Sequence, residues 1–426
     1  MEIRGPAFHE LARERLLPVA LETMLVGHLL DRALMPQVVI AARDVAVVDQ
    51  VAIDEWMGAS PVYTGRMRRL MGIGGDGVDA IMKALQLDVG FPHQYMDVGW
   101  KLIDARHGEF WLRHCGALMD VEPHGEKRVV GMCHTIEDPT FDATAYATNP
   151  RARIRPIHRP PRVPADRHPH CHWTIAIDPA NEPVAAASQT HAVAALPLAH
   201  LANERAPERD PVGLRDYRGA FDPDFKLGKL STATLAAVSR EFQIQSHLLA
   251  SSAELTLEAR FGAPKARELL AAQWAAVAWV AAERLARALG PARGGSDTLA
   301  DVLRLHAALP PGFTRSVEAG RDCVRLAMKP ESAELLDPAN PGWLGLLARG
   351  TASGVEAIAQ AVEPRARLGA LETSRGRVVA EFEIDAARPL AKAPKEAAFM
   401  QLSTATRWIF DIRKAVPSPA EQVDRP

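Results

Sequence analysis

The chain has 426 residues, of which 47% are hydrophobic and 24% are charged. This composition is typical of globular proteins and excludes the low hydrophobicity and high charge of disordered chains. The 50 basic and 52 acidic residues nearly cancel, so we expect no nucleic-acid partner. The length exceeds that of one ordinary hydrophobic core, so we expect two domains.

Targeting and membrane signals are weak along the chain. The first fifteen residues carry several charges and lack the continuous apolar region of a secretory signal. The most apolar stretches, 16–34 and 271–281, either carry charges or fall short of the roughly 18 residues that a membrane span needs. The four cysteines are too few and too scattered for a disulfide framework. We therefore expect a cytoplasmic protein without a membrane partner.

The first 90 residues are expected to be mostly helical. Apolar residues recur with helical spacing from Arg13 to about Asp31, and similar patterns cover roughly 41–57, 63–71 and 77–87. The glycine-rich run 72–77 follows a helical pattern and not a strand, and it lacks the Gly-Lys-Ser/Thr ending of a P-loop. We interpret this run as a turn between two helices.

Strand patterns follow. Residues 95–104 and 109–122 are rich in aromatic and branched side chains, and Arg106-His107-Gly108 between them suits a hairpin turn. A further strand is expected over 172–178. The segment 149–169 contains six prolines, which exclude a regular helix or a central strand, so we expect an extended arm there. This half of the chain thus predicts a helical layer over an antiparallel sheet.

A similar order of elements follows a loop-rich stretch. Ser231 suits a helix N-cap, and helices are expected over 233–260 and 264–289, ending at Gly290-Pro291. A second sheet is expected around 317–328 and 378–385. The predicted fold is α+β, with domains at 1–180 and 229–415, a connector at 181–228 and a flexible tail at 416–426. The alanine-rich helical faces are compatible with association of the chain into a homo-oligomer.

The repeated order of elements suggests a degenerate internal duplication, and two local similarities support it, although matches this short also arise by chance. Arg113-His114-Cys115 resembles Arg321-Asp322-Cys323, and the segment 173–178 resembles 380–385. If the duplication is real, its second copy has lost every histidine of the cluster described next.

Histidine and cysteine are concentrated in one segment. Eight of the fifteen histidines and three of the four cysteines lie in the segment from His107 to His172. Imidazole, thiolate and carboxylate groups are the ligands of zinc and iron sites. No doubled Cys-x-x-Cys spacing is present, so the ligands would have to converge from separate strands and loops, as in catalytic sites with an open position. We predict a divalent metal, Fe or Zn.

Strand alternation helps to choose among these residues. Cys171 shares its face with Trp173 and is expected in the core, whereas His170 and His172 lie on the opposite face. We expect Asp138 to orient a ligand or act as a general base, and Cys133 to be an alternative ligand or a nucleophile. For each residue alone, an ordinary structural role is the competing interpretation. The predicted ligands are His114, His134, Glu137 and His158, with His170 or His172 as a supporting or substitute ligand.

Arginines are frequent in the proline-rich arm. Of these, Arg153, Arg155 and Arg159 are predicted to bind a small anionic substrate, because guanidinium groups hold carboxylate or phosphate through paired hydrogen bonds. The alternative is that these arginines pair with the acidic residues of the segment 122–142.

The layout of a helical layer, a strand ending in Arg113-His114-Cys115, an Arg/Pro segment and the strand at His170-Cys171-His172-Trp173 resembles the L-2-amino-thiazoline-4-carboxylic acid hydrolase-like family. The resemblance covers about residues 90–180 and implies hydrolysis of a small ring that bears a carboxylate. The additional histidines and the second domain depart from the family pattern, so its substrate is not transferred.

These features predict a metal-dependent enzyme, with a hydrolase preferred, in which the ion activates water and the arginines receive the substrate. A mononuclear non-heme iron oxygenase is the alternative enzyme, because the same ligand types suit iron. A non-catalytic metal-binding or structural protein is the third hypothesis, and it requires a closed site without an adjacent cavity.

Overall fold

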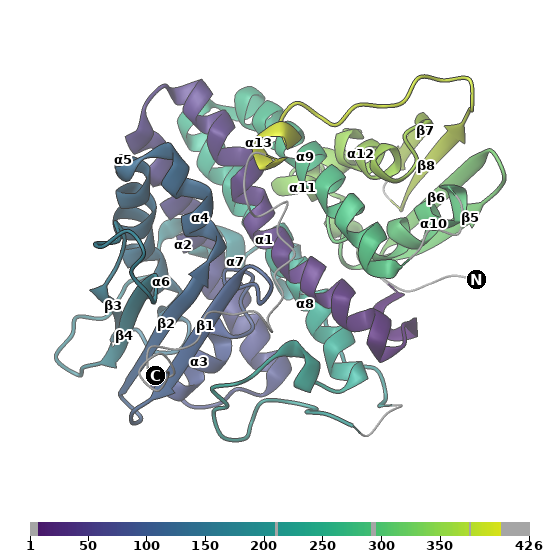
Figure 1. The fold of residues 1–426 in the computed structure, drawn as a ribbon. Coiled ribbons are helices and arrows are strands. Elements are labelled where there is room, and N and C mark those ends of the chain that lie inside the picture. The colour runs from purple at the N-terminus through teal and green to yellow at the C-terminus, as the bar shows by residue number, and fades with distance from the viewer. Residues whose placement is uncertain (1–6, 209–211, 291–294, 375, 402–426) are drawn as a thin grey trace.

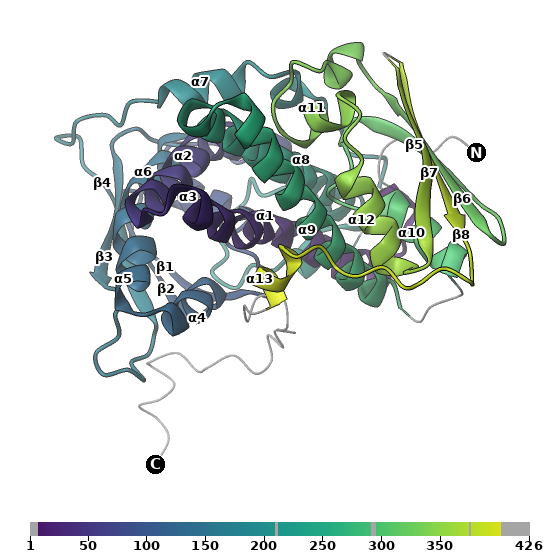
Figure 2. The ribbon, with the colours of Figure 1, turned by 90° about the horizontal axis from the view of Figure 1, so that it is seen from above.

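The protein is described by a computed structural model over residues 7–208, 212–290, 295–374 and 376–401. The fold is α+β, as predicted, with helices and two separate four-stranded antiparallel sheets. The sheets lie at opposite ends of the molecule, and the long helices pack between them (Figure 1, Figure 2). The predicted tail at 416–426 and residues 402–415 of the predicted second domain lie outside the described residues.

The first half of the chain begins with long helices and ends with the first sheet. Its main elements are α1 (Arg13–Ala42), α2 (Val45–Met71), α3 (Val78–Leu85), β1 (Met96–Leu102), β2 (His107–Cys115), α4 (Gly116–Val121), α5 (Glu126–Val130), the π-helical turn η3 (Gly131–Ile136), α6 (Glu137–Tyr146), β3 (Ala152–His158) and β4 (Cys171–Ile177).

The second half repeats this order after a connecting segment that holds α7 (Ser188–Ala194). Ser231 caps the first long helix through a hydrogen bond from the Thr234 amide, as the sequence predicts. The elements are α8 (Thr232–Phe261), α9 (Ala263–Leu289), α10 (Gly295–Leu305), β5 (Phe313–Ala319), β6 (Cys323–Pro330), η6 (Ala333–Leu336), α11 (Gly342–Ala348), α12 (Ser353–Val362), β7 (Ala366–Ser374), β8 (Arg377–Ile384) and α13 (Ala397–Gln401).

The two sheets share their strand order and their register. The orders are β1-β2-β4-β3 and β5-β6-β8-β7. The paired residues correspond at one end of each strand pair: Leu102 with Gly108 and Ala319 with Val324, His107 with Ala176 and Cys323 with Glu383, Ala152 with Ile177 and Ala366 with Ile384. Further along, β-bulges shift the register at places that differ between the sheets, in β1 and β3 of the first and in β7 of the second. A common register at this end of three strand pairs is strong support for an internal duplication, because a slip of one residue would reverse every side chain.

The register confirms one of the two predicted local similarities and corrects the other. Ile177 and Ile384 hold equivalent places, so the match of 173–178 with 380–385 is in register. The match of Cys115 with Cys323 is wrong, because Cys115 ends β2 whereas Cys323 begins β6. The structural equivalent of Cys323 is His107.

One predicted strand boundary is wrong, and one edge strand was not predicted. The predicted strand 109–122 ends at Cys115, because Gly116 begins α4 and the Cys115 thiol accepts a hydrogen bond from the Leu118 amide. A Cβ on Gly116 would lie 2.0 Å from the Tyr95 ring, so this position needs glycine. The proline-rich arm contains β3, which the sequence did not indicate. β3 lies at the sheet edge, where a proline such as Pro156 is tolerated.

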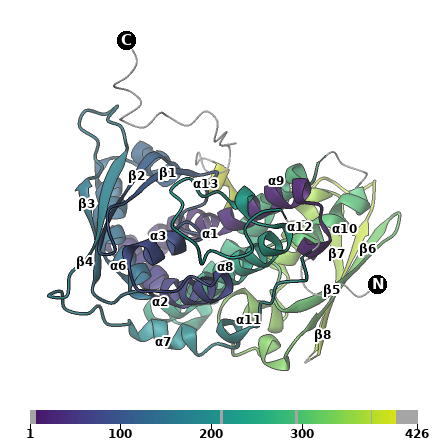
Figure 3. The ribbon, with the colours of Figure 1, turned by 90° about the horizontal axis from the view of Figure 1, so that it is seen from below.

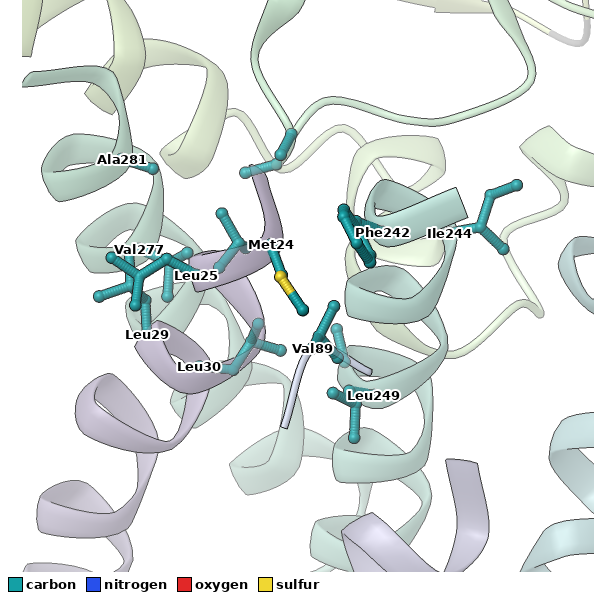
Figure 4. Packing of buried hydrophobic residues seen from close by; sticks show 14 of the residues in the cluster. Met24, Leu25, Leu29, Leu30, Val89, Phe242, Ile244, Leu249, Val277 and Ala281 are labelled. Atoms are coloured by element: carbon teal, nitrogen blue, oxygen red, sulfur yellow. The ribbon is translucent and has the colours of Figure 1, made fainter. Parts of the chain in front are cut away.

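The core between the sheets is shared by both halves. α1 packs against α8 and α9, and α2 packs against α8 (Figure 3). Figure 4 shows Met24, Leu25 and Leu29 of α1 meeting apolar side chains of α8 and α9, among them Phe242 and Val277. Among the described residues, α1 is the one helix long and apolar enough to cross a membrane by length and composition, and most of its apolar window is buried in this core.

A buried ion pair joins the two halves. Arg66 of α2 donates from Nε and Nη2 to the Glu241 carboxylate of α8, at 2.7 and 3.0 Å, and from Nη1 to the Ala199 carbonyl. Asn203 donates to the same carboxylate. Both charged side chains are almost fully buried, so each depends on the other for solvation.

We expect Glu241→Gln to lower the free energy of unfolding by about 3–5 kcal/mol, because it leaves the Arg66 guanidinium buried without a counter-charge. Urea denaturation measures this change. The control is Glu381→Gln in the exposed Arg325–Glu381 pair, where the expected loss is below about 1 kcal/mol. Equal losses in the two variants would contradict this account of the interface.

Candidate functional site

A cavity of about 530 Å³ lies in the first half, between α1, α2, the helical segment 117–144 and the inner face of the first sheet. Its walls are mainly apolar, with Leu112 and Trp173 of the sheet facing Val48 and Ala52 of α2. Phe399 of α13, from the end of the described chain, also lines it. The volume is in the range of small-molecule sites.

His28 of α1 is one of the polar residues that line this cavity. Its Nε2 lies 2.9 Å from the Gly90 carbonyl oxygen, so Nε2 carries the proton in the neutral ring. Burial lowers the pKa of His28 to about 4, so the ring is uncharged at neutral pH. The other nitrogen, Nδ1, is buried and has no hydrogen-bond partner among the described residues.

Asp31 lies one turn further along α1. Its Oδ2 accepts a hydrogen bond of 3.0 Å from the indole nitrogen of Trp56, and its Oδ1 is buried without a partner in the described chain. Burial raises the pKa of Asp31 to about 6, and the neighbouring Arg32 opposes that rise. Asp31 therefore adds a second unsatisfied acceptor beside that of His28.

Two tyrosine–carboxylate pairs contribute Tyr63, Asp88 and Asp120 to the polar lining. Tyr63 donates to Asp88 at 3.0 Å, and burial raises the pKa of Asp88 to about 6. Tyr95 donates to Asp120 at 2.5 Å, and Arg32 lies 3.8 Å from the same carboxylate. The cavity thus holds more carboxylates than cations, which favours a neutral or cationic ligand.

Glu137 lines the cavity from the start of α6, together with the thiols of Cys115 and Cys171. Burial raises the pKa of Glu137 to about 8, against the lowering effect of Arg159. Cys171 is buried on the inner face, as predicted. Burial also raises the pKa of Cys133 well above its usual value, so this residue is a thiol at neutral pH rather than a ready nucleophile.

The predicted histidine ligands occupy three separate places. The ring of His170 lies 5.4 Å from that of His114 and 5.2 Å from that of His168, centroid to centroid. His134 Nε2 lies 2.7 Å from the Pro160 carbonyl oxygen. His158 and His172 are register partners on the outer face of the sheet.

Glu137 is the one predicted ligand that lines the cavity, in the part of the chain that the structure describes. His172 has another neighbour, the Glu109 carboxylate at 3.1 Å. Within the described ranges, no three His, Cys, Asp or Glu side chains are grouped as a metal site requires. Metal binding by the sequence-predicted set stays a prediction, and it would require these side chains to move together.

The predicted substrate-binding arginines have carboxylate partners in the same domain. Arg155 donates twice to Asp142 at 2.7 and 2.8 Å, and Arg153 lies 3.8 Å from that carboxylate. Arg159 donates to Asp138 at 2.6 Å. These contacts agree with the alternative interpretation, in which the arginines pair with the acidic residues of the segment 122–142. The contact with Arg159 also engages Asp138, the predicted general base.

Sequence reasoning missed the polar residues of the cavity. His28 and Asp31 are polar residues within the apolar helical pattern of 16–34, and that interruption was the available signal. Asp88 and Trp56 gave none, because their meeting depends on tertiary packing. No protein-family model, curated protein or solved structure matches the chain.

The low pKa of His28 predicts a pH effect on stability. Its contribution is fully present above the unfolded value of 6.5 and is lost as the pH falls towards about 4. We expect His28→Gln to reduce proton uptake on unfolding near pH 5 by about one, measured as the slope of unfolding free energy against pH. His247→Gln, which removes a second buried imidazole of lowered pKa, serves as a parallel case. A slope equal to that of the parent protein in both variants would contradict the assignment.

Proposed function

We propose that the chain binds a small, mostly apolar organic molecule in the cavity of its first half, with a hydrogen-bond donor of the ligand directed at His28 and Asp31. The observation that carries the proposal is the pair of buried acceptor atoms, His28 Nδ1 and Asp31 Oδ1, which have no partner among the described residues. Buried polar atoms are normally paired, and an unpaired one at a cavity wall is commonly satisfied by a ligand or by water.

The energetics favour an apolar ligand body. The sheet and α2 present Leu112, Trp173 and Val48 to the cavity, and burying apolar surface there contributes about 25 cal/mol per Å². The acceptors then select the orientation, because a donor group left among apolar side chains would lose its hydrogen bonds to water.

The proposal is tested with N-phenyl-1-naphthylamine, an uncharged apolar fluorophore with one N–H group. We expect saturable binding to the full chain, and at least tenfold weaker binding to Met132→Trp, which places an indole in the cavity. Met132→Leu, which nearly conserves the volume, is the matched control and should bind like the parent. Unchanged binding in both variants would place the fluorophore elsewhere and contradict the proposal.

A metal-dependent hydrolase remains a second candidate, and an iron oxygenase is its variant. The imidazoles of His114 and His168 each lie beside that of His170, but among the described residues the three are not grouped as a metal site requires. The anionic substrate predicted with it belongs to the arginine-rich arm and not to the cavity.

Elemental analysis of the purified protein separates this candidate from the first. The metal hypothesis expects about one equivalent of zinc or iron, lost in a His114→Ala/His134→Ala variant that still binds the fluorophore. Redox-active iron would favour oxygen chemistry, and zinc would favour hydrolysis. Absence of metal from both proteins would contradict this candidate and leave the cavity proposal intact.

A further inference from the structure

Glu137 differs from the other carboxylates that line the cavity. Asp31, Asp88 and Asp120 each accept a hydrogen bond from a tyrosine or tryptophan side chain. Among the described residues, no hydrogen bond or ion pair engages the Glu137 carboxyl. Glu137 is also only partly buried, and its carboxyl oxygens are not among the polar atoms that the protein encloses without a partner. A ligand in the cavity can therefore reach this carboxyl.

A single helical segment carries Glu137 along one wall of the cavity. The lining residues Arg128, Met132, Ile136 and Thr140 recur every four residues through α5, η3 and α6. Glu137 follows directly after the π-helical turn η3 and lines the cavity beside Ile136. A π-helical turn adds a residue to a helix and is frequent at functional sites. The local backbone thus supports a ligand contact at this position.

The cations around Glu137 are engaged by other carboxylates. Arg159, whose charge opposes the rise in the pKa of Glu137, donates a hydrogen bond of 2.6 Å to Asp138. The two arginines that line the cavity, Arg32 and Arg128, form ion pairs with aspartates at 3.8 and 3.1 Å. A further cation would therefore be needed to balance a carboxylate at Glu137.

The rest of the lining suits a positively charged group. In the part of the chain that the structure describes, four carboxylate side chains and two arginines line the cavity, so its charge favours a cation. Phe141, one helical turn after Glu137, lines the cavity together with Trp173, and their ring centroids lie 5.0 Å apart. Aromatic rings attract ammonium groups through their faces. A carboxyl beside aromatic rings is thus a suitable environment for an amine.

We propose that the ligand of the first-half cavity is an organic amine whose protonated amino group binds at the Glu137 carboxyl, while its apolar body occupies the rest of the cavity. This inference rests on the proposed function and specifies its ligand class. The amino group is a second polar group of the ligand, in addition to the donor directed at His28 and Asp31. An ammonium group favours the ionised form of a neighbouring carboxyl, so the two would form a charged hydrogen bond.

The test compares 1-naphthylmethylamine with 1-naphthalenemethanol as competitors of N-phenyl-1-naphthylamine on the full chain at neutral pH. The two molecules share their ring and nearly share their shape, but only the amine is charged. We expect the amine to compete about tenfold better, because a charged hydrogen bond contributes more than a neutral one. Equal or better competition by the alcohol, or competition by neither while the fluorophore binds, would overturn the amine class alone. Absence of fluorophore binding would overturn the proposed function as well.

Variants of matched charge locate the contact. Glu137→Gln nearly conserves the volume and removes the charge, so it should reduce the preference for the amine to about twofold or less and leave the affinity for the alcohol within about twofold. Glu126→Gln removes an exposed carboxylate of α5 that does not line the cavity, and it should keep the preference of the parent protein. Fluorophore binding by each variant reports that its cavity has formed. A preference that Glu137→Gln leaves unchanged, or that both variants reduce equally, would overturn the role of Glu137.

Glu137→Asp keeps the charge on a shorter side chain. It should retain a larger preference for the amine than Glu137→Gln does, because the carboxylate remains at the cavity wall. The same competition assay measures this difference. A preference no larger than that of Glu137→Gln would overturn the dependence of amine binding on the charge at this position.

Discussion

A buried imidazole bonded to a main-chain carbonyl fixes the distance between the central helix and the sheet in each half of the molecule. Burial keeps His28 and His247 uncharged, so each ring carries one N–H group. That group donates a hydrogen bond to a main-chain carbonyl, of Gly90 or of Ala307, in the segment before the first strand of each sheet. The other nitrogen of His28, a residue that lines the cavity, is then left as an acceptor without a partner among the described residues. The cavity and its polarity follow from this contact, because α1 and the first sheet form opposite walls of it.

The two halves share an arrangement of helices and strands but differ in the residues near the buried histidine. In the second half Trp343 packs against the buried histidine, whereas in the first half a cavity is present and is lined by Asp31 and Asp88. Unpaired buried carboxyls reduce stability, and a scaffold without a ligand would gain by replacing them with apolar residues. Under the proposed function, a bound molecule would satisfy the unpaired carboxyl oxygen of Asp31. The helical core that the two halves share would then maintain the shape of the first-half cavity.

The α+β class, the capped helix at Ser231 and the buried face of β4 could be predicted, because helical spacing, capping chemistry and strand alternation are local properties. The short helices of 116–146 and the edge strand β3 could not, since prolines and mixed polarity hide their periodicity. Their residue type indicated the histidines of the first sheet as candidate ligands. Residue type alone does not determine whether such side chains meet in the folded chain. The cavity depends on helix packing, and its one local signal was His28 and Asp31 within an apolar stretch.

The most direct test of the account is a crystal structure of the full chain with 5-bromoindole, located by the anomalous scattering of bromine. The account predicts one principal bromine site inside the first-half cavity, with the N–H of the ring directed at His28 and Asp31. Bromine only at the surface, or a cavity that holds ordered water alone in the presence of saturating probe, would contradict it.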